Sequence, residues 1–358
     1  MAASVDQENT EGNCARPAGK LLGWYDTHAR VLPWRAPPGT PRPEPYRVWL
    51  AEVMLQQTTT AAVAPYFARF TERWPSVEAL AAADEGEVMA AWAGLGYYAR
   101  ARNLIACARA VAALGGRFPA TEAELRGLPG LGAYTAAAVA AIAFGQRAVV
   151  IDANVERVVA RLFAIAEPLP RARGAIRAAT DGITPDMRSG DFAQAMMDLG
   201  ATICTSRSPR CAICPLALEC QGRASGEPER LPVKAAKAAR PARKGRAYWI
   251  ERDGAVWLVR RPAKGMLGGM LALPDDSWSA RSDGNGNAPL SGEWRVTGAV
   301  VHVFTHFSLE LQVMLYSGGD WDSLDAARGE WWPIARLGEA GLPTLFAKAA
   351  QRAMAERE

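Results

Sequence analysis

Residues 121–145, TEAELRGLPGLGAYTAAAVAAIAFG, predict two helices joined by a glycine hairpin. Thr121 and Glu124 form a capping-box pattern, which starts the helix leading into the hairpin. The alanine-rich run after the hairpin is helical in character, and Gly145 is well placed to end it. The stretch is therefore typical of a helix–hairpin–helix unit, with Tyr134 just past its second glycine.

The hairpin glycines, Gly130 and Gly132, allow a tight turn and a close approach of the backbone to a partner. A hairpin that opens a helix also presents free N–H groups and the positive end of the helix dipole, which together favour an anion. We expect that anion to be a DNA phosphate. An ordinary turn between two helices would explain the hairpin alone equally well.

Helical spacing of apolar residues continues on both sides of this unit. From Tyr46 to about Ala201 the predicted helices are short, rich in alanine and stopped by glycine or proline. A helix over residues 20–30 comes first, and six prolines at 33–45 predict a long irregular connection after it. The polar residues 1–19 are typical of a disordered tail and hold no apolar core of a signal peptide.

The pattern changes after Cys220. Residues 223–246 predict an interdomain linker, with seven basic and no acidic residues between Arg230 and Arg246. Beyond it the apolar period becomes two: the runs around Asp253-Gly254 predict a hairpin, and residues 307–315 a half-buried strand. Residues 275–292 form a polar loop. The predicted fold is a mainly helical region at 20–222 and a smaller α+β domain at 247–358.

Composition places the chain among ordinary globular proteins. It has 358 residues, of which 49% are hydrophobic and 22% charged, and this length fits two domains. The net charge of +4 permits an acidic partner without proving one. The longest apolar run, near 136–144, is far too short to cross a membrane, so we expect a cytosolic protein.

Four of the six cysteines fall within seventeen residues, with the spacing C-x6-C-x2-C-x5-C: Cys204, Cys211, Cys214 and Cys220. In a cytosolic chain such a group indicates a metal site rather than disulfides. Four thiolates can wrap one tetrahedral centre, and the ligand type alone allows zinc or a [4Fe-4S] cluster.

Two carboxylates are candidates for catalysis. Glu52 lies in YRVWLAEVMLQQT, where most of its helical neighbours at three and four positions are apolar. Burial there would raise the pKa of the carboxyl and make it a candidate general acid, whereas at a rim it would simply pair with an arginine. Asp152 lies in VVIDANVERV before a new helix, and an N-cap alone would explain it.

The helical region uses only arginine for positive charge, because no lysine occurs between Lys20 and Lys234. Arginine stays protonated and cannot form a Schiff base. A mechanism with a lysine nucleophile is therefore excluded from this region, apart from reach by Lys20 or the N-terminus.

Several segments, in this order along the chain, resemble the helix–hairpin–helix DNA glycosylase superfamily, and within it the adenine DNA glycosylase (MutY) family. They are LPWR, EVMLQQT, GLGYYARARNL, LPGLGAYTA, IDANVERV, QAMMDLGATIC and the four-cysteine loop. The resemblance implies a monofunctional glycosylase of base excision repair, which removes adenine mispaired with 8-oxoguanine or guanine from double-stranded DNA. It also implies a six-helix barrel at 45–150 and a [4Fe-4S] cluster domain at 20–44 and 151–222. We expect a monomer.

The same resemblance implies roles for individual residues. Glu52 would protonate N7 of adenine, and Asp152 would stabilise the cation left when the C1′–N9 bond breaks, before water completes the hydrolysis. Tyr134 and Asn154 would orient these carboxylates around an adenine flipped out of the duplex. Two further positions match residues that contact the extruded base: Arg35 and Gln194. Four match residues that contact the duplex near 8-oxoguanine: Gln57, Thr58, Leu95 and Tyr97.

The C-terminal domain resembles the Nudix-like domain with which the family reads 8-oxoguanine. The family's F-S-H loop appears here as Phe304-Thr305-His306, so Thr305 and His306 would contact the lesion. A glutamate-rich Nudix box is missing, which predicts recognition without pyrophosphate hydrolysis. Three residues depart from the family pattern: Ala153 for a glycine, Glu156 for a basic residue and Thr305 for a serine.

Two other functions remain open. A glycosylase/lyase similar to endonuclease III, acting on oxidised pyrimidines, shares the hairpin, the aspartate and the cluster. It would need a lysine at position 134 and would lack the C-terminal domain. A non-enzymatic, metal-stabilised DNA-binding module would explain the hairpin and the cysteines but not Glu52 on an apolar stripe.

Overall fold

The computed structural model describes residues 5–235, 240–262, 265–318 and 320–356, with the backbone alone at 5–16. The chain divides into two compact units: unit 1 combines Met1–Ala82 with Ala106–Ala236, and unit 2 combines Ala83–Ile105 with Lys237–Glu358. Residues 83–105 thus group with the C-terminal part, whereas the sequence placed them in the helical region. Within the described ranges, no helix is both long and apolar enough to cross a membrane.

Unit 1 is built from helices, as predicted. Its helices are α1 (Val5–His28), α2 (Pro45–Leu55), α3 (Thr60–Arg73), α4 (Val77–Ala82), α7 (Glu122–Leu125), α8 (Ala133–Phe144), α9 (Ala153–Leu162), α10 (Arg173–Ile183), α11 (Ser189–Thr202) and α12 (Gln221–Ala224). Two 3-10 turns, η1 (Cys211–Ile213) and η2 (Pro228–Arg230), follow α11, and α6 (Ala99–Ala113) runs from unit 2 into unit 1.

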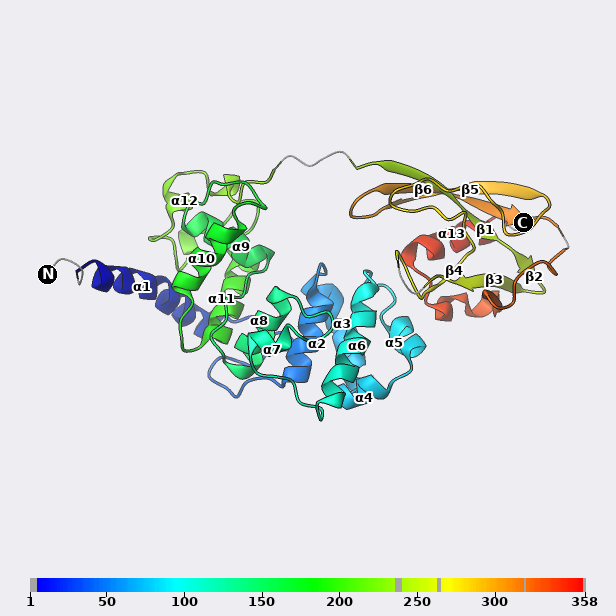
Figure 1. The fold of residues 1–358 in the computed structure, drawn as a ribbon. Coiled ribbons are helices and arrows are strands. Elements are labelled where there is room, and N and C mark those ends of the chain that lie inside the picture. Colours follow the sequence, from blue (N-terminus) through cyan, green and yellow to red (C-terminus); the bar gives the residue numbers. More distant parts are fainter. Residues whose placement is uncertain (1–4, 236–239, 263–264, 319, 357–358) are drawn as a thin grey trace. The chain divides into compact units, whose positions relative to one another are not determined.

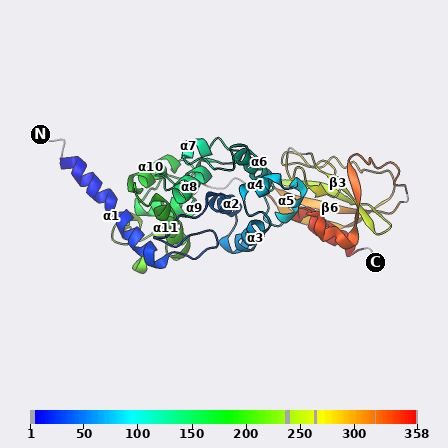
Figure 2. The same ribbon diagram turned by 90° about the horizontal axis from the view of Figure 1, so that it is seen from below.

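The core of unit 1 forms around α8, which packs against α2, α7 and α11 (Figure 2). Every residue from Thr135 to Ala143 is buried, which explains why this helix is apolar on all sides. Its many alanines let the neighbouring helices approach closely. Because α9 packs in turn on α11, the first turns of α8 and α9 come to lie near the C-terminal half of α2.

The helix–hairpin–helix prediction is confirmed in its local details. The Thr121 side chain caps the single turn of α7 by accepting a hydrogen bond from the backbone N–H of Glu124 at 3.3 Å. Gly145 ends α8 in the left-handed conformation, with φ of 69°. The irregular connection predicted at 33–45 is also present, and α2 begins at Pro45.

The N-terminal tail was predicted wrongly, because α1 begins at Val5 and residues 5–19 are helical. Pro17 lies inside this helix and leaves one intrahelical hydrogen bond unmade. The prediction relied on polarity, but a polar segment that continues an existing helix adds one hydrogen bond per residue without a new nucleus.

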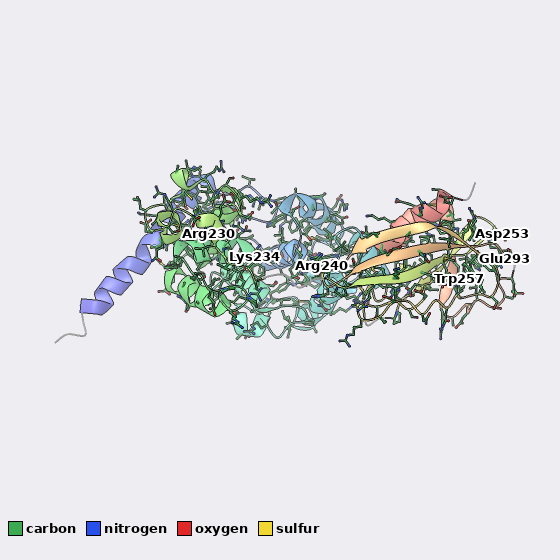
Figure 3. All side chains as sticks on the ribbon, turned by 90° about the horizontal axis from the view of Figure 1, so that it is seen from above. Arg230, Lys234, Arg240, Asp253, Trp257 and Glu293 are labelled. Carbon is green, nitrogen blue, oxygen red and sulfur yellow. The ribbon has the colours of Figure 1, made fainter. Side chains whose placement is uncertain are left out.

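The predicted linker at 223–246 is also shorter than expected. The backbone N–H of Leu169 donates to the carbonyl of Val233 at 2.9 Å, and Arg161 Nε donates to the carbonyl of Leu231 at 2.9 Å. Residues up to 235, including Arg230 and Lys234, therefore belong to unit 1 (Figure 3). Strand β1 already begins at Ala242, and residues 236–239 lie outside the described residues.

Unit 2 is an α+β domain with two small sheets (Figure 1). In the first sheet, β6 (Ser308–Tyr316) lies between a parallel β1 (Ala242–Trp249) and an antiparallel β5 (Trp294–Val303). Helix α13 (Thr344–Met354) packs against this sheet. The remaining elements are α5 (Glu85–Ala91), β2 (Glu251–Arg252), β3 (Ala255–Arg260), β4 (Leu271–Ala272), β7 (Gly329–Pro333) and η3 (Ile334–Ala340).

Both strand predictions in unit 2 are confirmed. The turn at Asp253-Gly254 joins β2 to β3 as an antiparallel hairpin, and Trp257 follows on β3 (Figure 3). In β6 the alternate residues Leu309, Leu311 and Val313 are fully buried, as expected for a strand with one face on the core.

Candidate active site

One cavity of about 1020 Å³ in unit 1 brings together most of the residues singled out from the sequence. Its walls come from the irregular connection before α2, from α2 itself, from the hairpin, and from α8, α9 and α11. The sequence-predicted residues that line it are Arg35, Glu52, Gln57, Thr58, Gly130, Gly132, Tyr134, Asp152, Asn154 and Gln194.

Glu52 is the buried acid of this cavity, with 5% of its surface exposed. The Tyr134 hydroxyl donates a hydrogen bond to Glu52 Oε2 at 2.6 Å. Burial raises the pKa of Glu52 to about 7, although the bond from Tyr134 and the charge of Arg35 lower it. Burial also keeps the pKa of Tyr134 well above its usual value, so this hydroxyl remains a donor. Glu52 can therefore hold a transferable proton near neutral pH.

Asp152 is the second carboxylate, and it is also the N-cap of α9. Its Oδ1 accepts a hydrogen bond from the backbone N–H of Val155 at 2.7 Å, and its Oδ2 accepts one from Asn154 Nδ2 at 2.9 Å. Ala153 is helical and free of the left-handed strain that would demand glycine. Glu156 faces Arg173, with 3.5 Å between Oε2 and Nε. The cap and the catalytic candidate are thus the same side chain.

Arg157 completes this group, although no sequence pattern singles it out. Its Nη2 donates to Asn154 Oδ1 and to the carbonyl oxygen of Gly200, both at 2.8 Å. Its Nε donates to the carbonyl oxygen of Cys204 at 2.8 Å. Because Asn154 Oδ1 already accepts from Arg157, the amide group must turn Nδ2 toward Asp152. The orientation of Asp152 therefore depends on α11 and on the start of the cysteine loop.

Gly200→Ala is expected to disturb the site through this contact. A Cβ at Gly200 would lie 2.6 Å from Asn154 Cβ and 3.1 Å from Asn154 Cα, closer than side chains tolerate. The start of α9 must then move, so we expect a slower chemical step and a loss of about 1–3 kcal/mol in the free energy of unfolding. Single-turnover rates and chemical denaturation would measure both effects.

The matched control is Gly182→Ala on α10, where a Cβ would meet nothing within 4 Å. That change is expected to leave the rate unaltered and to keep or slightly raise stability, because alanine favours helix. Equal behaviour of the two variants would show that the contact between Gly200 and Asn154 does not position Asp152.

Arg35 and Gln194 both line the cavity, but each has a partner within the protein. Arg35 Nη1 donates to Asp198 Oδ2 at 2.7 Å, and Asp198 is fully buried in α11. Gln194 Nε2 donates to the carbonyl oxygen of Gly190 at 3.3 Å. Asp198 was not recognised from the sequence.

Two residues predicted to enter the duplex have left-handed backbones although neither is glycine. Gln57, which follows α2, has φ of 58°, and Tyr97 in unit 2 has φ of 48°. Such conformations cost free energy and concentrate at functional sites. Thr58 follows Gln57, and its hydroxyl donates to the carbonyl oxygen of Gln56 at 3.3 Å.

The other sequence-predicted residues lie in unit 2. Leu95 is buried, whereas Tyr97 is 49% exposed. The hydroxyl groups of Tyr97 and Thr305 lie 3.3 Å apart within unit 2, and His306 beside them is exposed. Tyr97 and Thr305, which are both expected from the sequence to lie near 8-oxoguanine, therefore lie close to each other within unit 2.

The glycine hairpin presents an uncapped helix end. Gly132 is the N-cap of α8 and makes no side-chain cap, so the first N–H groups of this helix keep their donor capacity. Gly130 has φ of 76°, which favours glycine. Gly132 has an ordinary φ of −79°, and a Cβ there would meet nothing within 4 Å. Neither the backbone conformation nor the packing therefore requires glycine at position 132. The lack of a side chain there leaves open space beside the start of α8.

The four cysteines of the loop line one small cavity beside Arg161. Arg161 Nη1 lies 3.3 Å from Cys204 Sγ, and the backbone N–H of Arg223 lies 3.4 Å from Cys220 Sγ. Donors of this kind stabilise thiolates that ligate iron–sulfur clusters. Among the described residues, this loop included, no group of three His, Cys, Asp or Glu side chains is arranged to hold a single metal ion.

Two family profiles match the chain. The profile described as HhH-GPD superfamily base excision DNA repair protein matches residues 50–178, and the NUDIX domain profile matches residues 246–352. Among solved structures, a thermostable thymine-DNA glycosylase is 30% identical with a TM-score of 0.54, over 60% of this chain and 99% of that one. An endonuclease III–DNA complex, at 23% identity and a TM-score of 0.51 over 60% and 97% of the chains, shares the fold.

Several curated relatives are adenine DNA glycosylases. The mouse protein is 35% identical over 82% of this chain and 69% of its own length, and that of Mycolicibacterium smegmatis is 42% identical over 58% and 70%. The human protein is 35% identical over 82% of this chain. The match spans 66% of the human relative and 58% of the Arabidopsis thaliana relative.

Proposed function

The chain belongs to the adenine DNA glycosylase family, and we propose on that premise that it hydrolyses the N-glycosidic bond of adenine in mispaired DNA. The observation that carries the proposal is the pair of unlike carboxyl groups in one cavity. Glu52 is buried, and burial raises its pKa to about 7, whereas Asp152 lies at the start of α9 and accepts two hydrogen bonds, from Asn154 and from the backbone N–H of Val155. Unlike environments for two carboxyl groups are the usual arrangement for cleaving glycosidic bonds.

In the proposed reaction, an adenine flipped out of the duplex enters the cavity between these groups. Glu52 gives its proton to N7, which makes the base a good leaving group. The C1′–N9 bond then breaks, and Asp152 stabilises the positive charge on the sugar. Water attacks C1′ and leaves an abasic site. Tyr134 fixes the acid by its hydrogen bond, and Asn154 fixes the aspartate.

The arrangement favours water over an amine nucleophile. The hairpin places a tyrosine, Tyr134, where a lyase similar to endonuclease III would need a lysine. The nearest lysines in sequence are Lys20, which pairs with Glu219, and Lys234, which lies in the packed segment after η2. We therefore propose a monofunctional enzyme that leaves the DNA strand intact.

We further propose that the base opposite the adenine is 8-oxoguanine or guanine. In unit 2, the residues that would contact this base are Tyr97, Thr305 and His306, and Leu95 lies two residues before Tyr97 in the sequence. In unit 1, the residues that would enter the duplex are Gln57 and Thr58. The contact of Tyr97 with Thr305 and the strained backbones of Gln57 and Tyr97 support this assignment. Gly130, Gly132 and the free end of α8 would hold a phosphate of the same DNA. The enzyme would act as a monomer in the compartment that contains the DNA.

Cys204, Cys211, Cys214 and Cys220 would hold a [4Fe-4S] cluster. Four thiols around one cavity, with N–H donors at two of the sulfur atoms, fit such a group. When bound, the cluster would hold the loop in place and take no part in base excision. The loop begins at Cys204, whose carbonyl oxygen also holds Arg157.

Purified protein is expected to be brown and to contain about four iron and four sulfide ions per chain. Elemental analysis and the visible absorption of sulfide-to-iron charge transfer would measure this. Bound zinc in place of iron would contradict the assignment. The Cys211→Ser variant is expected to lose the colour. The control variant Cys107→Ser, which changes a buried cysteine outside the loop, is expected to keep it.

Single-turnover excision assays on three duplexes test the proposed function. Adenine release is expected opposite 8-oxoguanine and opposite guanine, with no action on thymine glycol and no strand cleavage before treatment with base. Failure to release adenine from the first duplex would refute the proposal. Trapping of a protein–DNA adduct by borohydride would instead favour the lyase.

A further inference from the structure

Asp198 is a fully buried carboxylate that the proposed reaction does not use. Its Oδ2 accepts hydrogen bonds from Arg35 Nη1 at 2.7 Å and from the backbone N–H of Arg30 at 3.0 Å. Its Oδ1 accepts no hydrogen bond within the described residues, and Arg30 Nη1 lies 3.8 Å away. Both arginines belong to the irregular connection between α1 and α2, so one side chain of α11 fixes this wall of the cavity.

Arg35 is the cation that this wall presents to the acid. Its side chain is only 9% exposed and lines the cavity together with Glu52 and Tyr134. A buried guanidinium without a counterion would take the nearest carboxylate as its partner, and Glu52 and Asp152 line the same cavity. An ion pair with Glu52 would remove the proton that the acid must donate. A bare positive charge would also oppose protonation of the base.

We propose that Asp198 is a positioning residue of the active site, which holds Arg35 away from Glu52 and compensates its charge, so that acid and base can both be protonated. The inference rests on the proposed function. It makes the pair of Arg35 and Asp198 a neutral donor group: Arg35 Nη1 binds Asp198, and the same side chain lines the cavity with N–H groups beyond the one that Asp198 accepts. Such a group can donate hydrogen bonds to the acceptor nitrogens of a purine without adding net charge.

Asp198→Asn tests the charge separately from the hydrogen bonds. A single oxygen of Asp198 accepts both bonds, so the one oxygen of an asparagine can keep both. The variant therefore removes the negative charge and leaves the wall anchored. The matched control on the same helix is Asp191→Asn, whose carboxylate pairs with Arg188 at 2.8 Å near the surface.

The expected result is a shift in the pH dependence of single-turnover adenine release. The pH above which the rate falls should move down by about one unit in Asp198→Asn, so that the rate drops about tenfold at pH 8 and much less at pH 6. The charges facing Glu52 are Arg35 and Asp152, with Tyr134 neutral, so Arg35→Met combined with Asp198→Asn should move the profile back. The double variant is still expected to have a higher KM than the wild type, because Arg35→Met removes the proposed contact of Arg35 with the base.

Three outcomes would overturn the proposal: an unchanged profile in Asp198→Asn, an equal shift in Asp191→Asn, or no recovery in the double variant. Because the double variant carries no unpaired buried charge, it should unfold at a higher temperature than Arg35→Met alone. This comparison of unfolding temperatures tests the pairing even if a single variant folds too poorly for kinetics. If the wild type releases no adenine, the proposed function fails separately. The gain in the free energy of unfolding that Glu52→Gln produces at pH 8 can then still be measured. It should be smaller in the Asp198→Asn background, because Arg35 would there stabilise the ionised Glu52.

Discussion

Glu52→Gln is expected to abolish adenine release while leaving the affinity for a duplex with A opposite 8-oxoguanine largely intact. Glutamine keeps the shape of the side chain and an oxygen that can accept the bond from Tyr134. It has no acidic proton, and general acid catalysis typically contributes about 10²–10⁴-fold to a rate. Single-turnover kinetics and equilibrium binding on the same duplex would measure the two effects separately.

The control for this prediction is Glu72→Gln, which removes an exposed carboxylate from α3 and should change neither quantity. Equal loss of binding and excision in Glu52→Gln would mean that Glu52 serves the structure of the site rather than the proton transfer. In the wild type, the rate should fall as the pH rises through about 7, the pKa that burial gives to Glu52.

The same substitution is expected to stabilise the protein in a pH-dependent way. The pKa of Glu52 is raised from 4.5 to about 7 on folding, so between these values the unfolded chain releases a proton that the folded chain keeps. Stability contributed by the wild-type side chain is complete below pH 4.5 and is lost as the pH rises through 7. The stability of Glu52→Gln relative to wild type should therefore increase by about 3 kcal/mol between pH 4 and pH 8, measurable by denaturation in matched buffers.

The burial of Glu52 could be predicted because it depends on the helical period alone. Val48, Trp49 and Leu55 share its face of α2, and a helix with that face apolar must turn it to the core. The capping role of Asp152 was also accessible from the sequence, since it follows from residue type at the start of a helix. Neither inference needed knowledge of distant parts of the chain.

The partners of these carboxylates were less accessible. Arg35 and Asp198 are 163 residues apart, and Arg157 and Cys204 are 47 apart. An arginine in an irregular segment and an aspartate in a helix carry no local signal of their pairing, because the contact depends on how α11 packs against the connection before α2. Only the resemblance to a family directed attention to Arg35, and it gave no reason to consider Asp198.

Backbone strain and the ends of ordered segments were not predictable either. Gln57 and Tyr97 take left-handed conformations that their residue types disfavour, so tertiary contacts must hold them there. Residues 223–235 have the composition of a linker, yet hydrogen bonds from Arg161 and Leu169 fix their backbone. Composition describes what a free segment would do, whereas these contacts come from the folded neighbours.

Asp152→Asn is expected to lower the rate of adenine release by roughly 10²–10³-fold or more, because a neutral side chain cannot stabilise the positive charge on the sugar. The fold should survive. Asparagine is as good an N-cap as aspartate, and its single oxygen can keep the bond from the N–H of Val155. Its amide would then point two hydrogens at Asn154 Nδ2, which is itself a donor. Asn154 cannot reverse its amide, because Arg157 donates to its Oδ1 at 2.8 Å.

Asp84→Asn separates the two functions of Asp152, because Asp84 is the N-cap of α5 and accepts from the backbone N–H of Glu87 at 3.0 Å. This control removes the same charge from the same kind of helix start outside the cavity, and it should leave the rate unchanged. Each substitution should change the free energy of unfolding by less than about 1 kcal/mol, the scale on which interchangeable caps differ. A large loss of stability in Asp152→Asn, with a loss of rate that Gly200→Ala reproduces in full, would assign Asp152 to the architecture of α9. A loss of rate at preserved stability, absent in Asp84→Asn, would assign it to the stabilisation of the sugar cation.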